Sequence, residues 1–222
     1  MKICNNVFLM VVVILMCTHV FGAEYGHIHS TEDSINYYKT KGGRFVANNR
    51  ALSFWKKKIQ NKDLKYLKFI PGISSLTLSE TQFSNDGAKY LADMNNIRSL
   101  FLEKTLVTSD GLKYFKDLVK LKVLNLNGTN IGNDGLKHLV NLHNLEALHI
   151  ADTQVTDEGL KYLQNLPKLY EIDLWNTRIT DKGVRYLEGM KDLKGVNLKG
   201  TKVTKSAVKR LMKKFPSIEV SY

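Results

Sequence analysis

Cysteine is nearly absent from this chain of 222 residues, which contains only Cys4 and Cys17. Both lie within residues 1–22, a segment that starts with a basic residue, continues as an apolar run and ends in Gly22. This is the pattern of a secretory signal peptide that is cleaved before Ala23. The exported chain would then have no thiol, which excludes disulfide-stapled ends and a cysteine nucleophile.

A run of apolar residues long enough to cross a membrane is also missing near the N-terminus. The run from Val7 to Cys17 has 11 residues, whereas a membrane-spanning helix needs about 20. We therefore expect a secreted, periplasmic or cell-surface protein. An uncleaved N-terminal membrane anchor is the alternative reading of residues 1–22.

Acidic residues are in the minority, with 21 Asp and Glu against 33 Lys and Arg and a net charge of +12. Residues 1–22 contain one basic and no acidic residue, so the exported chain keeps a net charge of +11. Such an excess of positive charge favours anionic partners. Nucleic acid is not expected among them, because an exported protein rarely meets it and the sequence has no recognition-helix or RNA-binding motif.

A repeat of 24 residues dominates the rest of the sequence. Apolar pairs recur in one register, and a threonine follows each pair three residues later. The pairs are Leu76/Leu78, Leu100/Leu102, Leu124/Leu126, Leu148/Ile150, Ile172/Leu174 and Val196/Leu198, and the threonines are Thr81, Thr105, Thr129, Thr153, Thr177 and Thr201. A unit of this size cannot bury its own apolar face, so the period predicts a stack whose units complete one another's core.

One complete unit is LEALHIADTQVTDEGLKYLQNL, residues 145–166. It resembles the leucine-rich repeat family, in the 24-residue, threonine-type variant typical of bacterial members. The resemblance implies an α/β solenoid, a curved horseshoe with a parallel β-sheet on the concave face and short helices on the convex face. It covers residues 47–222 as about seven repeats plus a closing strand near Val220, and the first repeat is degenerate because Lys57 replaces the threonine.

Residues 23–46 do not follow the repeat. Ser30 and the acidic residues after it favour a helix start, and Gly42 and Gly43 favour its end. We expect this short helix to form an N-terminal cap over the first repeat. A loose tether is the alternative, because terminal segments are often poorly ordered.

Two polar columns of the repeat have structural interpretations. The threonine column replaces an asparagine ladder of the family that it resembles, and we expect each buried hydroxyl to bond a carbonyl of the neighbouring turn. Ser84, Thr108, Thr156 and Thr180 precede the helical segments, where a hydroxyl caps free amides at a helix start.

The residues that flank the inward-pointing pairs face the concave side and vary between repeats. Adjacent strands lie about 4.8 Å apart, so seven of these residues are expected to form one patch. They are Phe101, Glu103, Asn125, Asn127, His149, Asp173 and Trp175. Exposed aromatic side chains among polar groups are typical of the centre of a protein-binding surface.

His149 and Asp173 are expected to be neighbours, and a carboxylate beside an imidazole is half of a catalytic arrangement. No serine or cysteine nucleophile lies nearby in the repeat, so we interpret them as a cross-strand polar pair. The other histidines are scattered over different faces. The sequence therefore predicts no catalytic residue, no metal site and no cofactor.

A column of cations recurs on the helices, at Lys89, Lys113, Lys137, Lys161, Arg185 and Lys209, and most are followed directly by an aromatic residue. We call this column the convex ladder. One interpretation is repeat inheritance, with the lysine stems lying over the tyrosine rings. The other is a binding strip for an acidic glycan, lipopolysaccharide or an anionic membrane surface.

Three functions are compatible with these patterns. The leading hypothesis is an exported, non-enzymatic module that binds a protein, of unidentified kind, through its concave face. The first alternative is an electrostatic binder of an anionic polymer or envelope surface through the convex ladder. The second alternative, implied by the resemblance, is a substrate adaptor or host-directed effector in ubiquitin ligation.

Overall fold

The computed structural model describes residues 30–46, 48 and 50–222. The predicted signal peptide, residues 1–22, and the first part of the segment 23–46 lie outside the described residues. None of the described helices has the length and apolar character needed to cross a membrane.

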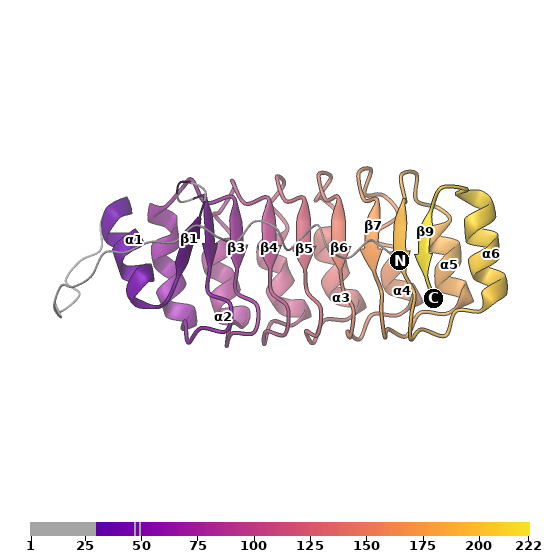
Figure 1. The fold of residues 1–222 in the computed structure, drawn as a ribbon, viewed down its shortest axis with the longest axis horizontal. Coiled ribbons are helices and arrows are strands. Elements are labelled where there is room, and N and C mark those ends of the chain that lie inside the picture. The colour runs from indigo at the N-terminus through magenta and orange to yellow at the C-terminus, as the bar shows by residue number, and fades with distance from the viewer. Residues whose placement is uncertain (1–29, 47, 49) are drawn as a thin grey trace.

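Short strands and short helices alternate along the chain (Figure 1). The strands are β1 (Arg44–Val46), β2 (Ala51–Ser53), β3 (Ser75–Thr77), β4 (Ser99–Phe101), β5 (Val123–Asn125), β6 (Ala147–His149), β7 (Glu171–Asp173), β8 (Gly195–Asn197) and β9 (Glu219–Ser221). The α-helices are α1 (Thr31–Thr40), α2 (Asn85–Ala88), α3 (Asn133–Leu136), α4 (Asp157–Leu160), α5 (Asp181–Leu187) and α6 (Lys205–Lys214). The 3-10 helices are η1 (Asn61–Phe69), η2 (Lys89–Leu91), η3 (Ser109–Phe115) and η4 (Lys137–Leu139).

The nine described strands form one sheet in chain order, and the helices lie behind it (Figure 1). From β2 to β9 each strand pairs in parallel with the next, with partners 24 residues apart, such as Leu124 and Leu148. The predicted α/β leucine-rich repeat solenoid is therefore confirmed. Strand β1 differs from the expected parallel pattern because it pairs antiparallel with β2. The connection between Val46 and Ala51 is too short for the crossover that a parallel pair requires.

Helix α1 packs on the first repeat. Ser30 accepts a hydrogen bond from the Asp33 amide, which caps the helix start as the sequence predicts. Tyr38 is fully buried, lies edge-on to Phe54 with 5.4 Å between ring centroids, and donates its hydroxyl to the Asp63 carbonyl at 2.8 Å. This side chain therefore joins the helix to the first turn through both apolar contact and a hydrogen bond.

The core is a continuous column of side chains between the sheet and the helices. The inward pairs, for example Leu124 and Leu126, have no exposed surface. Full burial of one leucine stabilises a fold by about 1.5–3 kcal/mol, and each inward leucine contacts residues of its own and of neighbouring turns in one cluster. The alternation of apolar residues thus determines which face of each strand is buried.

The six threonines of the repeat form a different hydrogen bond from the one expected. Each hydroxyl donates to the carbonyl three residues earlier, in its own turn: Thr153 to Ile150 at 2.7 Å, and Thr177 to Leu174 at 2.6 Å. The other four, Thr81, Thr105, Thr129 and Thr201, do the same. The expectation of a bond to the neighbouring turn was wrong, because the carbonyl of the same turn lies closer to a side chain as short as threonine.

A second polar column connects the turns. Asp157 accepts the backbone amide of Thr180 at 2.8 Å and its hydroxyl at 2.7 Å, across 23 residues. Asp181 accepts the same two donors from Thr204 at 2.7 and 2.8 Å. Asparagine occupies the position in other turns, at Asn61, Asn85 and Asn133, where its oxygen accepts the amide and its NH2 donates to the hydroxyl. We call these five residues the inter-turn ladder.

The inter-turn ladder changes the role expected for the hydroxyls before the helices. The hydroxyls of Ser84, Thr108 and Thr156 accept no hydrogen bond from a helix amide. Each accepts instead from the side-chain NH2 of an asparagine in the inter-turn ladder. Of the four predicted caps, only the Thr180 hydroxyl accepts a hydrogen bond from a helix amide, that of Lys182. The ladder further explains a repeated glycine, because a Cβ at Gly183 would lie 2.4 Å from Oδ1 of Asp157.

Replacing Asp181 with asparagine should weaken the acid sensitivity of the fold. Hydrogen bonds from the Thr204 amide and hydroxyl hold the pKa of Asp181 below its usual range. A depressed folded pKa stabilises the protein above the unfolded pKa, and this stabilisation is lost as the pH falls through the folded pKa. The free energy of unfolding in urea, measured between about pH 5 and 2, should therefore decline less steeply in Asp181→Asn.

Asparagine occurs naturally at the equivalent positions, so the Asp181→Asn variant should still fold. Asp192→Asn serves as control, because Asp192 is exposed and forms no hydrogen bond to another described residue. If the free energy of unfolding fell equally steeply with pH in Asp181→Asn and in the unaltered chain, Asp181 would not be a source of the acid sensitivity. Some slope should remain in the variant, since ion pairs also lower the pKa of Glu158 and Asp134.

Candidate binding surfaces

The predicted concave patch is assembled by four neighbouring strands. Phe101, Asn125, His149 and Asp173 are successive Cα partners across β4 to β7. All four side chains are partly exposed. Glu103, Asn127 and Trp175 lie two residues beyond the ends of β4, β5 and β7. The structure thus brings all seven predicted residues onto one face, although their role in binding stays a prediction.

Three of the polar residues in this patch also stabilise the strand ends. Asn125 accepts the amide of Asn127 at 2.9 Å, and Asn127 accepts the amide of Ala151 at 2.7 Å. Asp173 accepts the amide of Trp175 at 3.1 Å. Their oxygens are therefore already partly used, and substitutions at these positions would disturb the backbone as well as the surface.

His149 does not form its ion pair with Asp173. Nε2 of His149 lies 3.6 Å from Oε1 of Glu171, the residue at the other outward position of β7. The longer side chain of Glu171 reaches diagonally across the strands, while the Asp173 carboxylate accepts the Trp175 amide. Glu171 was not predicted because the patch was drawn from the column of Asp173 and the column two residues after it, although strict alternation places the column two residues before it on the same face.

Trp175 is the most exposed aromatic residue of the patch, with 44% of its surface accessible. Its indole N–H has no hydrogen-bond partner among the described residues. Trp55 occupies the same column at the other end of the sheet and is 52% exposed, but its indole N–H donates to Glu80 at 3.2 Å. Lys56 additionally lies over its ring, with Nζ 4.6 Å from the centroid.

The convex ladder is exposed along its whole length, at all six positions. Nζ of Lys113 lies 5.1 Å from the ring centroid of Tyr114, and the contacts of Lys89 and Lys161 with the tyrosines after them are alike. Lys137 pairs with Asp134, and Lys161 lies 3.4 Å from Glu158. Lys137 also lies over the ring of Tyr162, so stacking on tyrosine accounts for four of the six positions, and ion pairs reduce the free positive charge at two of these four.

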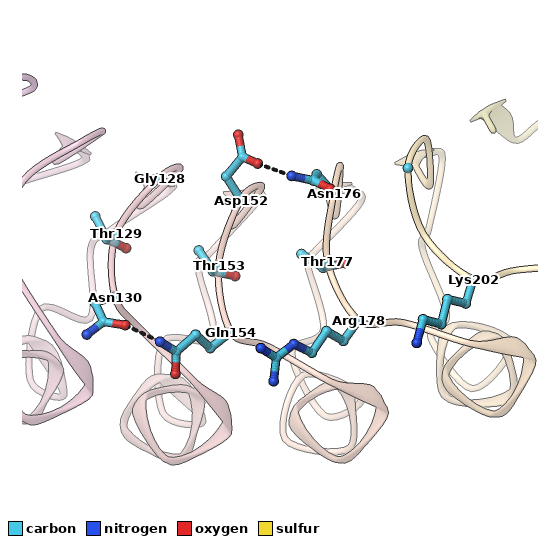
Figure 2. A pocket seen from close by; sticks show the side chains of 11 residues that line it. Gly128, Thr129, Asn130, Asp152, Thr153, Gln154, Asn176, Thr177, Arg178 and Lys202 are labelled. Atoms are coloured by element: carbon cyan, nitrogen blue, oxygen red, sulfur yellow. Dashed lines mark hydrogen bonds between the residues drawn. The ribbon is translucent and has the colours of Figure 1, made fainter.

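A polar groove of about 670 Å³, not expected from the sequence, crosses the loops after β5, β6, β7 and β8 (Figure 2). We call it the loop groove. It is lined by Gly128, Thr129, Asn130, Asp152, Thr153, Gln154, Asn176, Thr177, Arg178, Gly200 and Lys202. The residue after each threonine of the repeat varies, as Asn130, Gln154, Arg178 and Lys202, and this variation was the one feature of the sequence that could have predicted the groove.

The concave face and the loop groove combine exposed polar, charged and aromatic side chains. Within the part of the chain that the structure describes, no group of three or more His, Cys, Asp or Glu side chains is placed to hold a metal ion. The arrangement of His149 and Glu171 offers an ion pair but no adjacent nucleophile, since Ala147 and Ala151 flank the histidine on its own turn.

Comparisons with known proteins agree with this architecture. A family model described as a leucine-rich repeat matches residues 118–140 and 141–163. A comparison with curated proteins found no match.

Solved structures with a similar fold include two internalins of Listeria monocytogenes and a leucine-rich repeat protein of Leptospira interrogans. One internalin is 21% identical over 67% of this chain and 48% of its own, with a TM-score of 0.53. The Leptospira protein is 20% identical over 71% of this chain and 45% of its own, with a TM-score of 0.53. Internalin C2 is 22% identical over 73% of this chain and 76% of its own, with a TM-score of 0.52.

This chain spans about half the length of the first two of these proteins. At such low identity the likeness shows the fold alone. Together with the matched repeats and the in-register parallel strands, it shows that the chain has a leucine-rich repeat fold.

Proposed function

We propose that this protein is an exported, non-enzymatic interaction module that binds a protein partner through its concave face. The observation that carries the proposal is the exposed Trp175 beside the partly exposed His149, Asp173 and Asn125 on a sheet whose other face is packed. Tryptophan is enriched at the energetic centres of interfaces, because its large ring buries much apolar area at little entropic cost.

Hydrogen bonding supports the choice of Trp175 as the central contact. A partner that covers the ring gains apolar burial and can also accept the unpaired indole N–H. The same gain is smaller at Trp55, whose N–H already donates to Glu80 and whose ring already carries Lys56. The patch also contains three carboxylates, of Glu103, Glu171 and Asp173, on a chain that is basic as a whole, which favours a specific complementary surface over a uniformly charged one.

Trp175→Ala should weaken partner binding strongly without unfolding the protein. Truncation of a central interface residue costs about 2 kcal/mol or more, which corresponds to roughly a 30-fold loss of affinity. Proteins captured by the unaltered chain would be identified by mass spectrometry, purified, and titrated by calorimetry against both forms.

Trp55→Ala is the matched control, since it removes an equally exposed tryptophan from the same column far from the patch. Unfolding curves should be nearly unchanged in both variants. Equal weakening by the two substitutions, or full affinity in Trp175→Ala, would refute the assignment of the concave patch.

Export is a separate part of the proposal, and it rests on the signal pattern of residues 1–22. Mass spectrometry of the protein from its natural host, with cell fractionation, should find a chain that begins at Ala23 outside the cytoplasm. An intact Met1 in the cytosol would overturn this part and leave the binding surface unaffected.

The convex ladder supports a second candidate function, binding of an anionic envelope surface. The supporting observation is that Lys89 and Lys113 are exposed and form no ion pair among the described residues. No feature of the described residues favours the ubiquitin-ligase adaptor or host-directed effector alternative, and we do not propose it.

Simultaneous replacement of Lys113, Lys137 and Lys161 by glutamine should weaken binding to lipopolysaccharide if the ladder is functional. The logarithm of the affinity of the unaltered protein should also fall linearly with the logarithm of salt concentration, because each released counterion adds to the slope. Binding measured by surface plasmon resonance that is insensitive to the triple substitution would exclude the ladder.

A further inference from the structure

We propose that the loop groove is a second binding site, and that it takes an acidic saccharide in which one or more carboxylates accompany many hydroxyl groups. The groove, which is built from the loops after the strands (Figure 2), has no lining residue in common with the concave patch. Its volume of about 670 Å³ lies within the range of small-ligand sites.

Two rows of residues form the walls of the loop groove. One row consists of Gly128, Asp152, Asn176 and Gly200, all with left-handed backbone and φ between 53° and 72°. The other row consists of Asn130, Gln154, Arg178 and Lys202. The buried threonines lie between the rows, with hydroxyls that already donate to carbonyls. The ligand-facing chemistry is therefore supplied by the two rows.

Two cations of the loop groove are available to an anionic ligand. Arg178 and Lys202 are exposed, lie one turn apart, and form no side-chain hydrogen bond or ion pair with another described residue. Figure 2 shows both side chains along the same wall. Asp152 is the sole acidic residue of the lining, and its carboxylate accepts a hydrogen bond from the side-chain NH2 of Asn176 at 2.5 Å. A guanidinium and an ammonium side by side are suited to a carboxylate.

The amides in the walls favour hydroxyl groups over further carboxylates. Gln154 donates its NH2 to Asn130, which leaves the NH2 of Asn130 as a donor. The oxygens of Gln154 and Asn176 remain as acceptors, because both residues use their NH2 groups in the printed bonds. Hydroxyl groups both donate and accept, so they match this alternation. A carboxylate-rich peptide would place its carboxylate oxygens, which only accept hydrogen bonds, against the accepting oxygens of Gln154 and Asn176.

Neighbouring turns show that stacking does not require this lining. At the positions equivalent to Asn130 and Arg178 the earlier turns carry Gln82 and Leu106, and Leu106 is 56% exposed. The exposed leucine interrupts the column, and an unbroken run of polar side chains extends only from Asn130 to Lys202. A polar lining without an aromatic or aliphatic pocket also disfavours an apolar ligand.

The test uses tetragalacturonate as probe, with its fully methyl-esterified form and tetraglutamate as comparisons, in isothermal titration calorimetry. Tetragalacturonate should bind, and the double variant Arg178→Gln/Lys202→Gln should weaken that binding about tenfold or more, because charge-assisted hydrogen bonds are lost. In NMR spectra, the side-chain amide signals of Asn130, Gln154 and Asn176 should shift during the titration.

The matched control is Arg185→Gln/Lys209→Gln, which removes the same charge from the convex ladder in the same two turns. It should retain the affinity for tetragalacturonate, and so should Trp175→Ala. The proposal is overturned by equal weakening in the two double variants, by equal affinity for the methyl ester, or by equal or tighter binding of tetraglutamate. Absence of measurable binding to tetragalacturonate would overturn it as well.

Discussion

Stacking of incomplete turns is the constraint on which this structure depends. A single turn contains a three-residue strand and a short helix, and neither can bury an apolar face without the next turn. The inward leucines therefore have to stand in the same register from strand to strand. The nine described strands form one sheet in chain order for this reason, and every outward position becomes a column whose members are neighbours in space.

Polar groups inside the stack are satisfied in two distinct ways. The threonine hydroxyls bond within their own turn and stabilise the bend after each strand. The inter-turn ladder bonds across turns and fixes the position of one helix start relative to the previous one. A buried donor or acceptor without a partner costs about 1–3 kcal/mol, so these two columns are as constrained as the leucines. Side chains of the variable columns that form no hydrogen bond with the framework, such as Trp175, are free to vary.

The candidate binding surfaces contain side chains that have no hydrogen-bond or ion-pair partner within the framework. On the concave face, Trp175 has an unpaired indole N–H, whereas Asn125 and Asn127 also hold backbone amides. In the loop groove, Arg178 and Lys202 are unpaired while Asp152 and Asn176 pair with each other. The convex ladder lies between these cases, since stacking on tyrosine already accounts for several of its lysines. Surface position alone therefore does not identify a site, and the partners of each side chain have to be known.

The sequence by itself determined the period, the buried columns, the parallel order of the repeats and two of the outward columns of the concave face. These follow from apolar alternation and from a 24-residue spacing, both of which can be read locally. The antiparallel pairing of β1, the choice of carbonyl by the threonines, the contact of His149 with Glu171 and the loop groove were decided only by the tertiary structure. The contact of His149 and the groove depend on the reach and direction of side chains in neighbouring turns, which spacing and residue type do not specify. The threonine bonds depend on which of two nearby carbonyls is closer, and the pairing of β1 depends on its short connection to β2.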